Sequence, residues 1–155
     1  MYQRILVPLD GSELAECVLP HVETITKGCG SREVIFIRAV EPFQRPSGFS
    51  EVTFSEEDLK RINTESINLA KTYLDQIVNR VKHDNVNVKS EVLTGKAGES
   101  IAEYATKNEV DLTIIATHGR SGISRWVWGS VADRLLRSAC VPVLMVRAPG
   151  CVPGF

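Results

Sequence analysis

Short apolar stretches recur along the chain, and they alternate with longer segments whose apolar residues fall at three- and four-residue steps. The short stretches are rich in β-branched residues and end at Gly, Pro, Asp or Ser, a pattern that predicts buried strands. The longer segments have the spacing of amphipathic helices. The predicted strands cover residues 4–9, 33–40, 86–94, 111–116 and 141–146.

Four helices are predicted between these strands. The first runs from Leu14 to the Gly28–Gly30 segment, with Asp10 or Ser12 as its cap and Pro20 as a kink. A long polar loop then precedes the second helix, and a loop of this length is typical of mobile or functional segments. The long loop covers residues 41–55, and the other three helices are predicted at 56–82, 99–108 and 130–138.

The strict alternation of strands and helices predicts an α/β fold with one open, mostly parallel, five-stranded sheet and helices on both faces. Pro142 lies inside the last apolar stretch, and a proline cannot donate a hydrogen bond to a neighbouring strand, so this strand is expected at an edge of the sheet. In such sheets ligands bind beyond the carboxyl ends of the strands, where the winding reverses.

Length and charge narrow the class of protein. The 155 residues suit one domain, predicted at 1–147 with a flexible tail at 148–155. Lys and Arg number 18 and Asp and Glu number 19, so no overall field favours nucleic acid or an anionic membrane. No apolar stretch approaches the ~20 residues of a membrane span, and a cytoplasmic location is expected. The scattered cysteines and histidines indicate no metal site.

Two strand ends carry unusual chemistry, the turn at 8–12 and the segment 116–130. Asp10 supplies a carboxylate that can accept from a ribose hydroxyl. Gly119 allows close approach of the backbone, and Ser130 opens a helix whose first N–H groups can bind an anion. These are the parts of a nucleotide site, although glycine-rich turns are also common as plain connections. Neither a Walker A sequence nor G-x-G-x-x-G after the first strand is present, which excludes the usual P-loop and dinucleotide-binding patterns.

From "RILVPLDGSE" to "VPVLMVR" the sequence resembles the universal stress protein family. The most specific feature is the family's nucleotide motif, which is Gly, two residues, Gly, nine residues, then Gly and Ser or Thr. Gly119, Gly129 and Ser130 match this motif at the required spacing, and Ala116 replaces its first glycine. The added methyl group bears on how closely the backbone at this position can approach a ligand.

The resemblance implies a Rossmann-like fold of the adenine nucleotide alpha hydrolase type, with strand order 3-2-1-4-5. It also implies ATP binding, with Mg²⁺ as a bridge between phosphates, and a homodimer formed through the last strand, Val141 to Val146. The main chain of Ala39 would read adenine, Asp10 would hold the ribose or adenine, and Pro8 would shape the pocket. The residues that the resemblance places at the nucleotide are Pro8, Asp10, Ala39, Ala116, His118, Gly119, Gly129, Ser130 and Val131.

Three functions are compatible with this sequence. The first is a homodimeric stress sensor or switch that binds an adenine nucleotide. The second is a slow ATPase, which is disfavoured because no general base is evident and His118 has no nucleophile nearby to activate. The third is a nucleotide-free relative that acts through protein–protein contacts, and Ala116 is the residue that favours it.

Overall fold

The computed structural model describes residues 1–44, 55–81, 85–117, 130–138 and 140–147. Its centre is one five-stranded sheet with the order β3-β2-β1-β4-β5, in which every pair of neighbouring strands is parallel. The predicted fold class and the implied strand order are therefore confirmed. The strands are β1 (Arg4–Pro8), β2 (Glu33–Val40), β3 (Asn87–Thr94), β4 (Leu112–Thr117) and β5 (Val143–Arg147).

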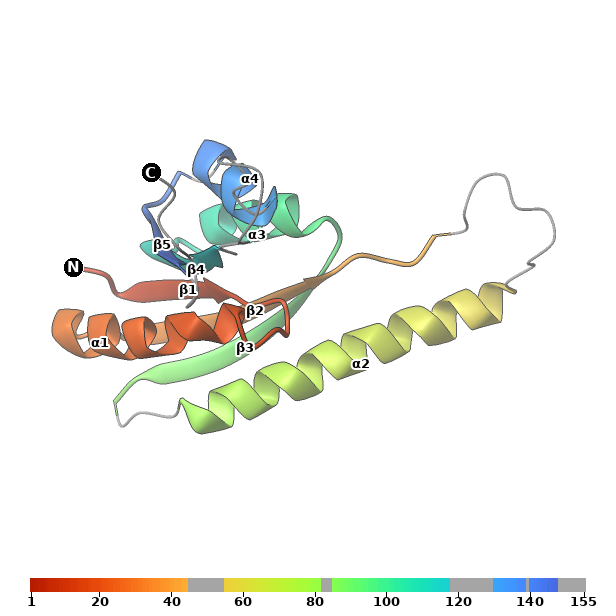
Figure 1. The fold of residues 1–155 in the computed structure, drawn as a ribbon, viewed down its shortest axis with the longest axis horizontal. Coiled ribbons are helices and arrows are strands. Elements are labelled where there is room, and N and C mark those ends of the chain that lie inside the picture. Colours follow the sequence, from red (N-terminus) through yellow and green to blue (C-terminus); the bar gives the residue numbers. More distant parts are fainter. Residues whose placement is uncertain (45–54, 82–84, 118–129, 139, 148–155) are drawn as a thin grey trace.

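Helices cover both faces of the sheet (Figure 1). On one face, α1 and α2 cover a core that includes Phe36 and Leu74, and on the other, α3 and α4 cover a core that includes Ile35 and Leu135. Adjacent β2 residues thus serve opposite cores, because successive side chains of a strand point to opposite faces. The helices are α1 (Leu19–Cys29), α2 (Glu56–Arg80), α3 (Ala97–Lys107) and α4 (Ser130–Ser138), with a short 3₁₀ helix, η1 (Ala15–Val18), before α1.

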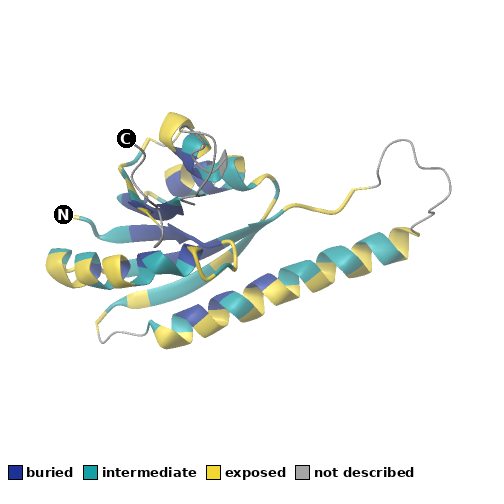
Figure 2. Ribbon diagram, in the orientation of Figure 1, coloured by how far each residue is buried: buried dark blue, intermediate teal, exposed yellow. Residues whose placement is uncertain are grey.

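The central strands are the most deeply buried part of the fold (Figure 2). Residues 5–8 of β1 and 34–37 of β2 are all buried, since helices cover both of their faces. The strand β3 at one edge has no buried residue, and its alternating sequence fits an edge with one wetter face.

Two details of the predicted elements were wrong. The helix expected from Leu14 onwards is divided into η1 and α1, because Pro20 lies in the first turn of α1, where its missing N–H and fixed φ are favourable. The last strand begins after Pro142 rather than including it, and the Pro142 carbonyl accepts a hydrogen bond from the N–H of Thr113. The inference drawn from that proline, an edge position for the strand, is nevertheless confirmed.

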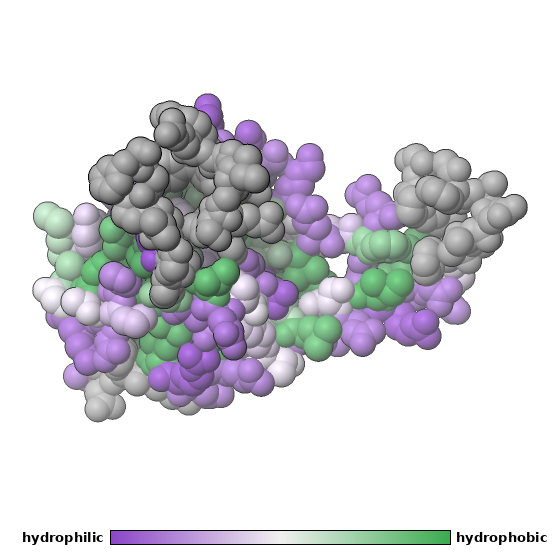
Figure 3. All heavy atoms as spheres, viewed as in Figure 1, coloured by the Kyte–Doolittle hydropathy of each residue, from purple (hydrophilic) through white to green (hydrophobic). Residues whose placement is uncertain are grey.

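Helix α2 extends beyond the sheet. Ser55 and Asp58 form a capping box at its start, and its 25 residues give a length of about 37 Å. The buried residues of α2 are Ala70, Leu74 and Ile77, all in its second half. The first half projects from the body and carries both hydrophilic and hydrophobic residues on its surface (Figures 1 and 3).

Parts of several predictions lie outside the described residues. They are the middle of the 41–55 loop, most of the 116–130 segment and the 148–155 tail. The described cysteines, Cys17, Cys29 and Cys140, are free thiols. No helix among the described residues has both the length and the apolar character to cross a bilayer.

Candidate functional site

The ends of β1 and β4 lie side by side at the carboxyl edge of the sheet. Ile5 and Leu6 of β1 are paired in parallel with Leu112 and Thr113 of β4, so both strands finish at the same edge. Between these two strands the winding of the sheet reverses, since β2 lies on the other side of β1. The structure therefore places the predicted turn after β1 and the start of the predicted segment after β4 at the switch point, where α/β folds bind ligands.

The turn after β1 is fixed by its own side chains. The Asp10 carboxylate accepts hydrogen bonds from the N–H of Ser12 at 2.8 Å and from its hydroxyl at 2.6 Å. The Ser12 hydroxyl oxygen in turn accepts from the N–H of Ala15, the first residue of η1, at 3.1 Å. Gly11 between them has φ of 90°, a conformation that favours glycine. Asp10 thus orients Ser12 and is itself an exposed residue at this edge.

Beyond this turn, β2 continues past the last residue of β1. The final β1–β2 pair is Pro8 with Ile37, and the Leu9 N–H donates to the Ile37 carbonyl at 2.9 Å. Main-chain groups two residues apart on a strand point to the same side, so those of Ala39 point toward the turn after β1. The Val40 carbonyl points the opposite way, since it accepts from the N–H of Gly95 beside β3. Ala39 therefore directs its amide toward the region where Pro8 and the turn lie.

The amino ends of α3 and α4 meet at the same edge. A Cβ added to Gly98, in the first turn of α3, would lie 2.7 Å from Arg134 Cβ and 3.8 Å from Val131 Cα. The two helix starts are therefore in contact, and Arg134 also forms an ion pair with Glu99 at 3.3 Å. Unpaired N–H groups at a helix start carry partial positive charge, and two such starts together favour an anion. Ser130 is the first residue of α4, as the sequence predicted.

Ala116 lies near the end of β4 with 8% of its surface exposed. Its side chain belongs to the core beneath α1 and α2, together with Val7 and Val146. The methyl group that distinguishes this chain from the family's glycine is thus accommodated in the core.

A cluster of charged and aromatic side chains lies beside the turn on the α2 side. The Arg38 guanidinium lies over the Tyr73 ring, with Cζ 5.5 Å from its centroid. The Tyr73 hydroxyl donates to Glu16 at 3.2 Å, and Arg80 forms an ion pair with Glu16 at 2.9 Å. Burial, followed by the negative charges of Glu16 and Asp10, raises the pKa of Tyr73 well above its usual range, so the hydroxyl remains a donor at neutral pH.

Neither Arg38 nor Tyr73 was among the predicted site residues, and Tyr73 was expected only as one of the regularly spaced apolar residues of the long helix. The signal was present, because Arg38 is a charged residue two positions after the core-facing Phe36 and so lies on the same face of β2. The sequence alone did not show how α2 packs against β2, and this packing places Tyr73 beside Arg38.

Five of the nine predicted site residues, and the backbone of a sixth, can be located. Pro8, Asp10 and Ala39 gather around the end of β1, whereas Val131 and the start of α4 belong to the α3 and α4 face. Ala116 lies one residue before the end of β4, the strand between β1 and β5. His118, Gly119 and Gly129 lie outside the described residues, as do the side chain of Ser130 and the arginines of the 118–129 segment. Within the described ranges, no group of His, Cys, Asp or Glu side chains is arranged to hold a metal ion.

The sequence matches the family model of the universal stress protein family over residues 1–147, and the chain belongs to that family. It is 29% identical to universal stress protein MJ0531 of Methanocaldococcus jannaschii, over 96% of this chain and 84% of the relative. It is also 29% identical to universal stress protein MJ0577 of the same organism, over 95% of this chain and 96% of the relative.

Solved structures show the same fold. The structure of MJ0577 matches 97% of this chain and 99% of its own, with a TM-score of 0.78 and 27% identity. A universal stress protein in complex with cAMP matches 95% of this chain and 98% of its own, with a TM-score of 0.68 and 22% identity. An Arabidopsis thaliana family member with AMP bound matches 96% of this chain and 93% of its own, with a TM-score of 0.66 and 14% identity.

Proposed function

We propose that this chain is a universal stress protein that binds an adenine nucleotide, with ATP as the expected ligand, and acts as a homodimeric stress-response switch. The observation that carries the proposal is the convergence of three features at the switch point: the Asp10 turn, the Ala39 main chain and the paired starts of α3 and α4. The AMP and cAMP complexes of family members with the same fold support an adenine nucleotide as the ligand.

Each described group has a defined task in this proposal. The exposed Asp10 carboxylate accepts hydrogen bonds from a ribose hydroxyl or an adenine amino group. The Ala39 amide, directed toward the turn, reads an edge of the base. The starts of α3 and α4 attract the phosphates. These groups fit a nucleotide, and Mg²⁺ would be held chiefly by the phosphate oxygens, since Mg²⁺ sites need few protein ligands.

The departure at Ala116 is the observation that favours the alternative, a nucleotide-free family member that acts through protein contacts. The burial of its methyl group in the core supports binding instead, because the group that differs from glycine packs against Val7 and Val146. Slow hydrolysis of the bound nucleotide is tested separately, by measuring the release of phosphate from protein loaded with ATP.

The second part of the proposal is a dimer formed through β5. This strand lies at the end of the sheet, and Leu144 is an exposed large hydrophobic residue. Within the described part of the chain no strand pairs with the outer side of β5, and such an apolar edge favours pairing with the edge of another copy. The variant Leu144→Lys is expected to shift the protein to monomer in light scattering, whereas Leu69→Lys on the exposed face of α2 leaves the assembly unchanged. The cytoplasmic location stays a prediction of the sequence.

Nucleotide binding is tested by thermal unfolding with millimolar ATP and Mg²⁺. Ligand at 100 times its Kd stabilises the folded state by about 2.7 kcal/mol, which raises Tm by several degrees. Asp10→Ala is expected to remove most of this shift, measured against its own ligand-free Tm. Glu103→Ala, which removes an exposed carboxylate from the middle of α3, is the matched control and keeps the shift. No shift in the wild-type protein would overturn the proposal.

A further inference from the structure

Arg38 occupies the space next to Gly11. A Cβ built on Gly11 would lie 2.7 Å from Arg38 Nη1 and 3.0 Å from its Cζ, so the guanidinium covers the side of the turn where any other residue would carry its side chain. Arg38 comes from β2, and its half-buried side chain lies on the α1 and α2 side of the sheet. The turn that holds Asp10 thus rests on a planar charged group rather than on solvent.

The other side of Arg38 rests on α2. Its Cζ lies 5.5 Å from the centroid of the Tyr73 ring, within the range of a cation–π contact. The ring is held in turn, because its hydroxyl donates to Glu16 of η1 and Glu16 is also paired with Arg80. A continuous series of contacts therefore runs from α2 through Tyr73 and Arg38 to the backbone of Gly11.

We propose that Arg38 is a positioning residue for the nucleotide: it sits between Gly11 and the Tyr73 ring, fixes the Asp10–Gly11–Ser12 turn in its binding geometry, and couples that geometry to helix α2. The effect on affinity rests on the nucleotide-binding function proposed above, whereas the effect on the turn does not. Arg38 acts through the backbone of Gly11 and the orientation of Asp10, and α2 thereby becomes the element through which a change elsewhere in the protein alters nucleotide affinity.

The first readout is local hydrogen exchange in the nucleotide-free protein. Arg38→Met keeps most of the side-chain volume but loses the charge and the planar group, and we expect amide exchange in residues 9–18 to accelerate about tenfold. Exchange in the buried 34–37 segment is the internal control and stays at the wild-type rate. Unchanged exchange in 9–18, or equal acceleration in both segments, overturns the proposal.

The second readout is the Kd for ATP by calorimetry. Arg38→Met is expected to raise Kd about tenfold, and Tyr73→Leu about threefold, since the latter removes only the support of the guanidinium. Tyr73→Phe keeps the ring and stays within about twofold of wild type. Arg38→Lys restores part of the lost affinity, because the ammonium keeps the charge over the ring.

The double variant Arg38→Met with Tyr73→Leu separates coupling from simple destabilisation. If Tyr73 acts through Arg38, the double variant binds ATP no more weakly than Arg38→Met alone, whereas independent effects multiply and contradict the proposal. A wild-type protein that binds no ATP removes the proposed function, and the exchange experiment alone then decides whether Arg38 holds the turn. A wild-type protein that binds ATP, together with an Arg38→Met variant of unchanged Kd, overturns the inference and leaves the proposed function intact.

Discussion

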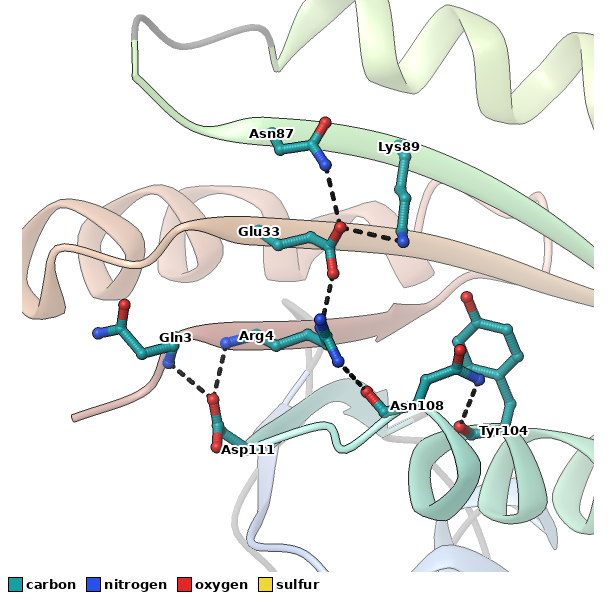
Figure 4. A network of polar contacts seen from close by, with 8 residues as sticks. All are labelled: Gln3, Arg4, Glu33, Asn87, Lys89, Tyr104, Asn108 and Asp111. Atoms are coloured by element: carbon teal, nitrogen blue, oxygen red, sulfur yellow. Dashed lines mark hydrogen bonds and ion pairs between the residues drawn. The ribbon is translucent and has the colours of Figure 1, made fainter.

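The two edges of the sheet use polar groups in opposite ways. At the amino edge, side chains bind one another and the main chain (Figure 4). Glu33 accepts from Arg4 at 2.7 Å, from Lys89 at 3.0 Å and from Asn87 at 3.0 Å, which joins the starts of β1, β2 and β3. At the carboxyl edge, the corresponding groups belong to a glycine turn, a strand end and two helix starts.

Asp111 completes the amino edge. One oxygen of its carboxylate accepts hydrogen bonds from the N–H groups of Gln3 and Arg4, each at 2.8 Å, just before β1 and β4 pair. Arg4 also donates to the carbonyl of Asn108 at the end of α3. This edge therefore closes the sheet with contacts inside the protein, whereas the opposite edge carries an exposed carboxylate, a main-chain amide and two helix starts. We therefore expect the first edge to contribute chiefly to stability and the second, under the proposed function, to contribute chiefly to nucleotide binding.

The largest effect is expected from Asp111→Ala at the amino edge. Removal of the carboxylate leaves two partly buried backbone N–H groups without their acceptor, which costs about 2–4 kcal/mol of unfolding free energy. Urea denaturation measures this loss. Asp111→Asn, which keeps one oxygen in place, is the matched control and loses less than half as much. An Asp111→Ala protein that remains folded binds ATP with wild-type Kd, and a weakened Kd would erase the division between the edges.

Gly11→Ala tests the carboxyl edge and is expected to cost about 2 kcal/mol, since the residue is strained at positive φ and its methyl group must displace Arg38. It should also weaken ATP binding. The control is Gly30→Ala at the end of α1, where φ is 62° and the described residues place no atom within 4 Å of the added Cβ. This control has the backbone strain of about 1 kcal/mol without the contact and leaves Kd unchanged. Equal effects of the two variants would show that Arg38 and the turn do not support each other.

Glu33→Gln is expected to cost about 1–2 kcal/mol at neutral pH, because the carboxylate accepts from three groups in the network. Burial acts to raise the pKa of Glu33, but hydrogen bonds and charge from Lys89 and Arg4 outweigh it, and the pKa lies below its ordinary value. A depressed folded-state pKa contributes stability above the unfolded pKa, near 4.3, and loses it as pH falls through the folded pKa.

The pH dependence provides the measurement for this variant. The difference in unfolding free energy between wild type and Glu33→Gln should be constant from pH 7 to about pH 5 and shrink as the pH falls further. Glu103→Gln is the control, since Glu103 is exposed and pairs with Lys107 on its own helix. A difference that grows as pH falls would mean that folding raises the pKa of Glu33 instead of lowering it, and would contradict the network.

The sequence pattern predicted the strands and helices of this molecule well and the side-chain contacts between them poorly. The pattern of apolar residues predicted the bounds of β2 and α4 correctly. The sequence changes at these boundaries: β2 ends where the polar Glu41 follows Val40, and α4 begins at the pair Gly129–Ser130. The switch point followed from the resemblance to the family and from the rule for parallel sheets. Pro142 and Pro20 were harder, since a proline marks a boundary without showing on which side of it the element lies.

The missing part consists of contacts between residues far apart in the chain. Glu33 and Asn87 are 54 positions apart, and Asp111 and Gln3 are 108 apart. Such pairs depend on strand register, which local patterns do not encode. The Arg38–Tyr73 contact was missed for the same reason. Asp10 was predicted as a site residue because local sequence sufficed: it lies in the turn directly after the first strand and in the stretch that resembles the family.

Ser12→Ala is expected to have the smallest effect on unfolding free energy and is the most sensitive test of the difference between the two edges. The hydroxyl accepts from the N–H of Ala15 at the start of η1 and donates to Asp10, so its removal costs about 0.5–1 kcal/mol. Asp10 keeps the hydrogen bond from the Ser12 N–H, and the Kd for ATP should therefore rise only about two- to threefold. Ser12→Thr retains the hydroxyl and restores both values. Asp111→Ala, in contrast, is expected to lose more stability and no affinity. The loss of affinity relative to the loss of unfolding free energy therefore identifies the edge to which a residue belongs.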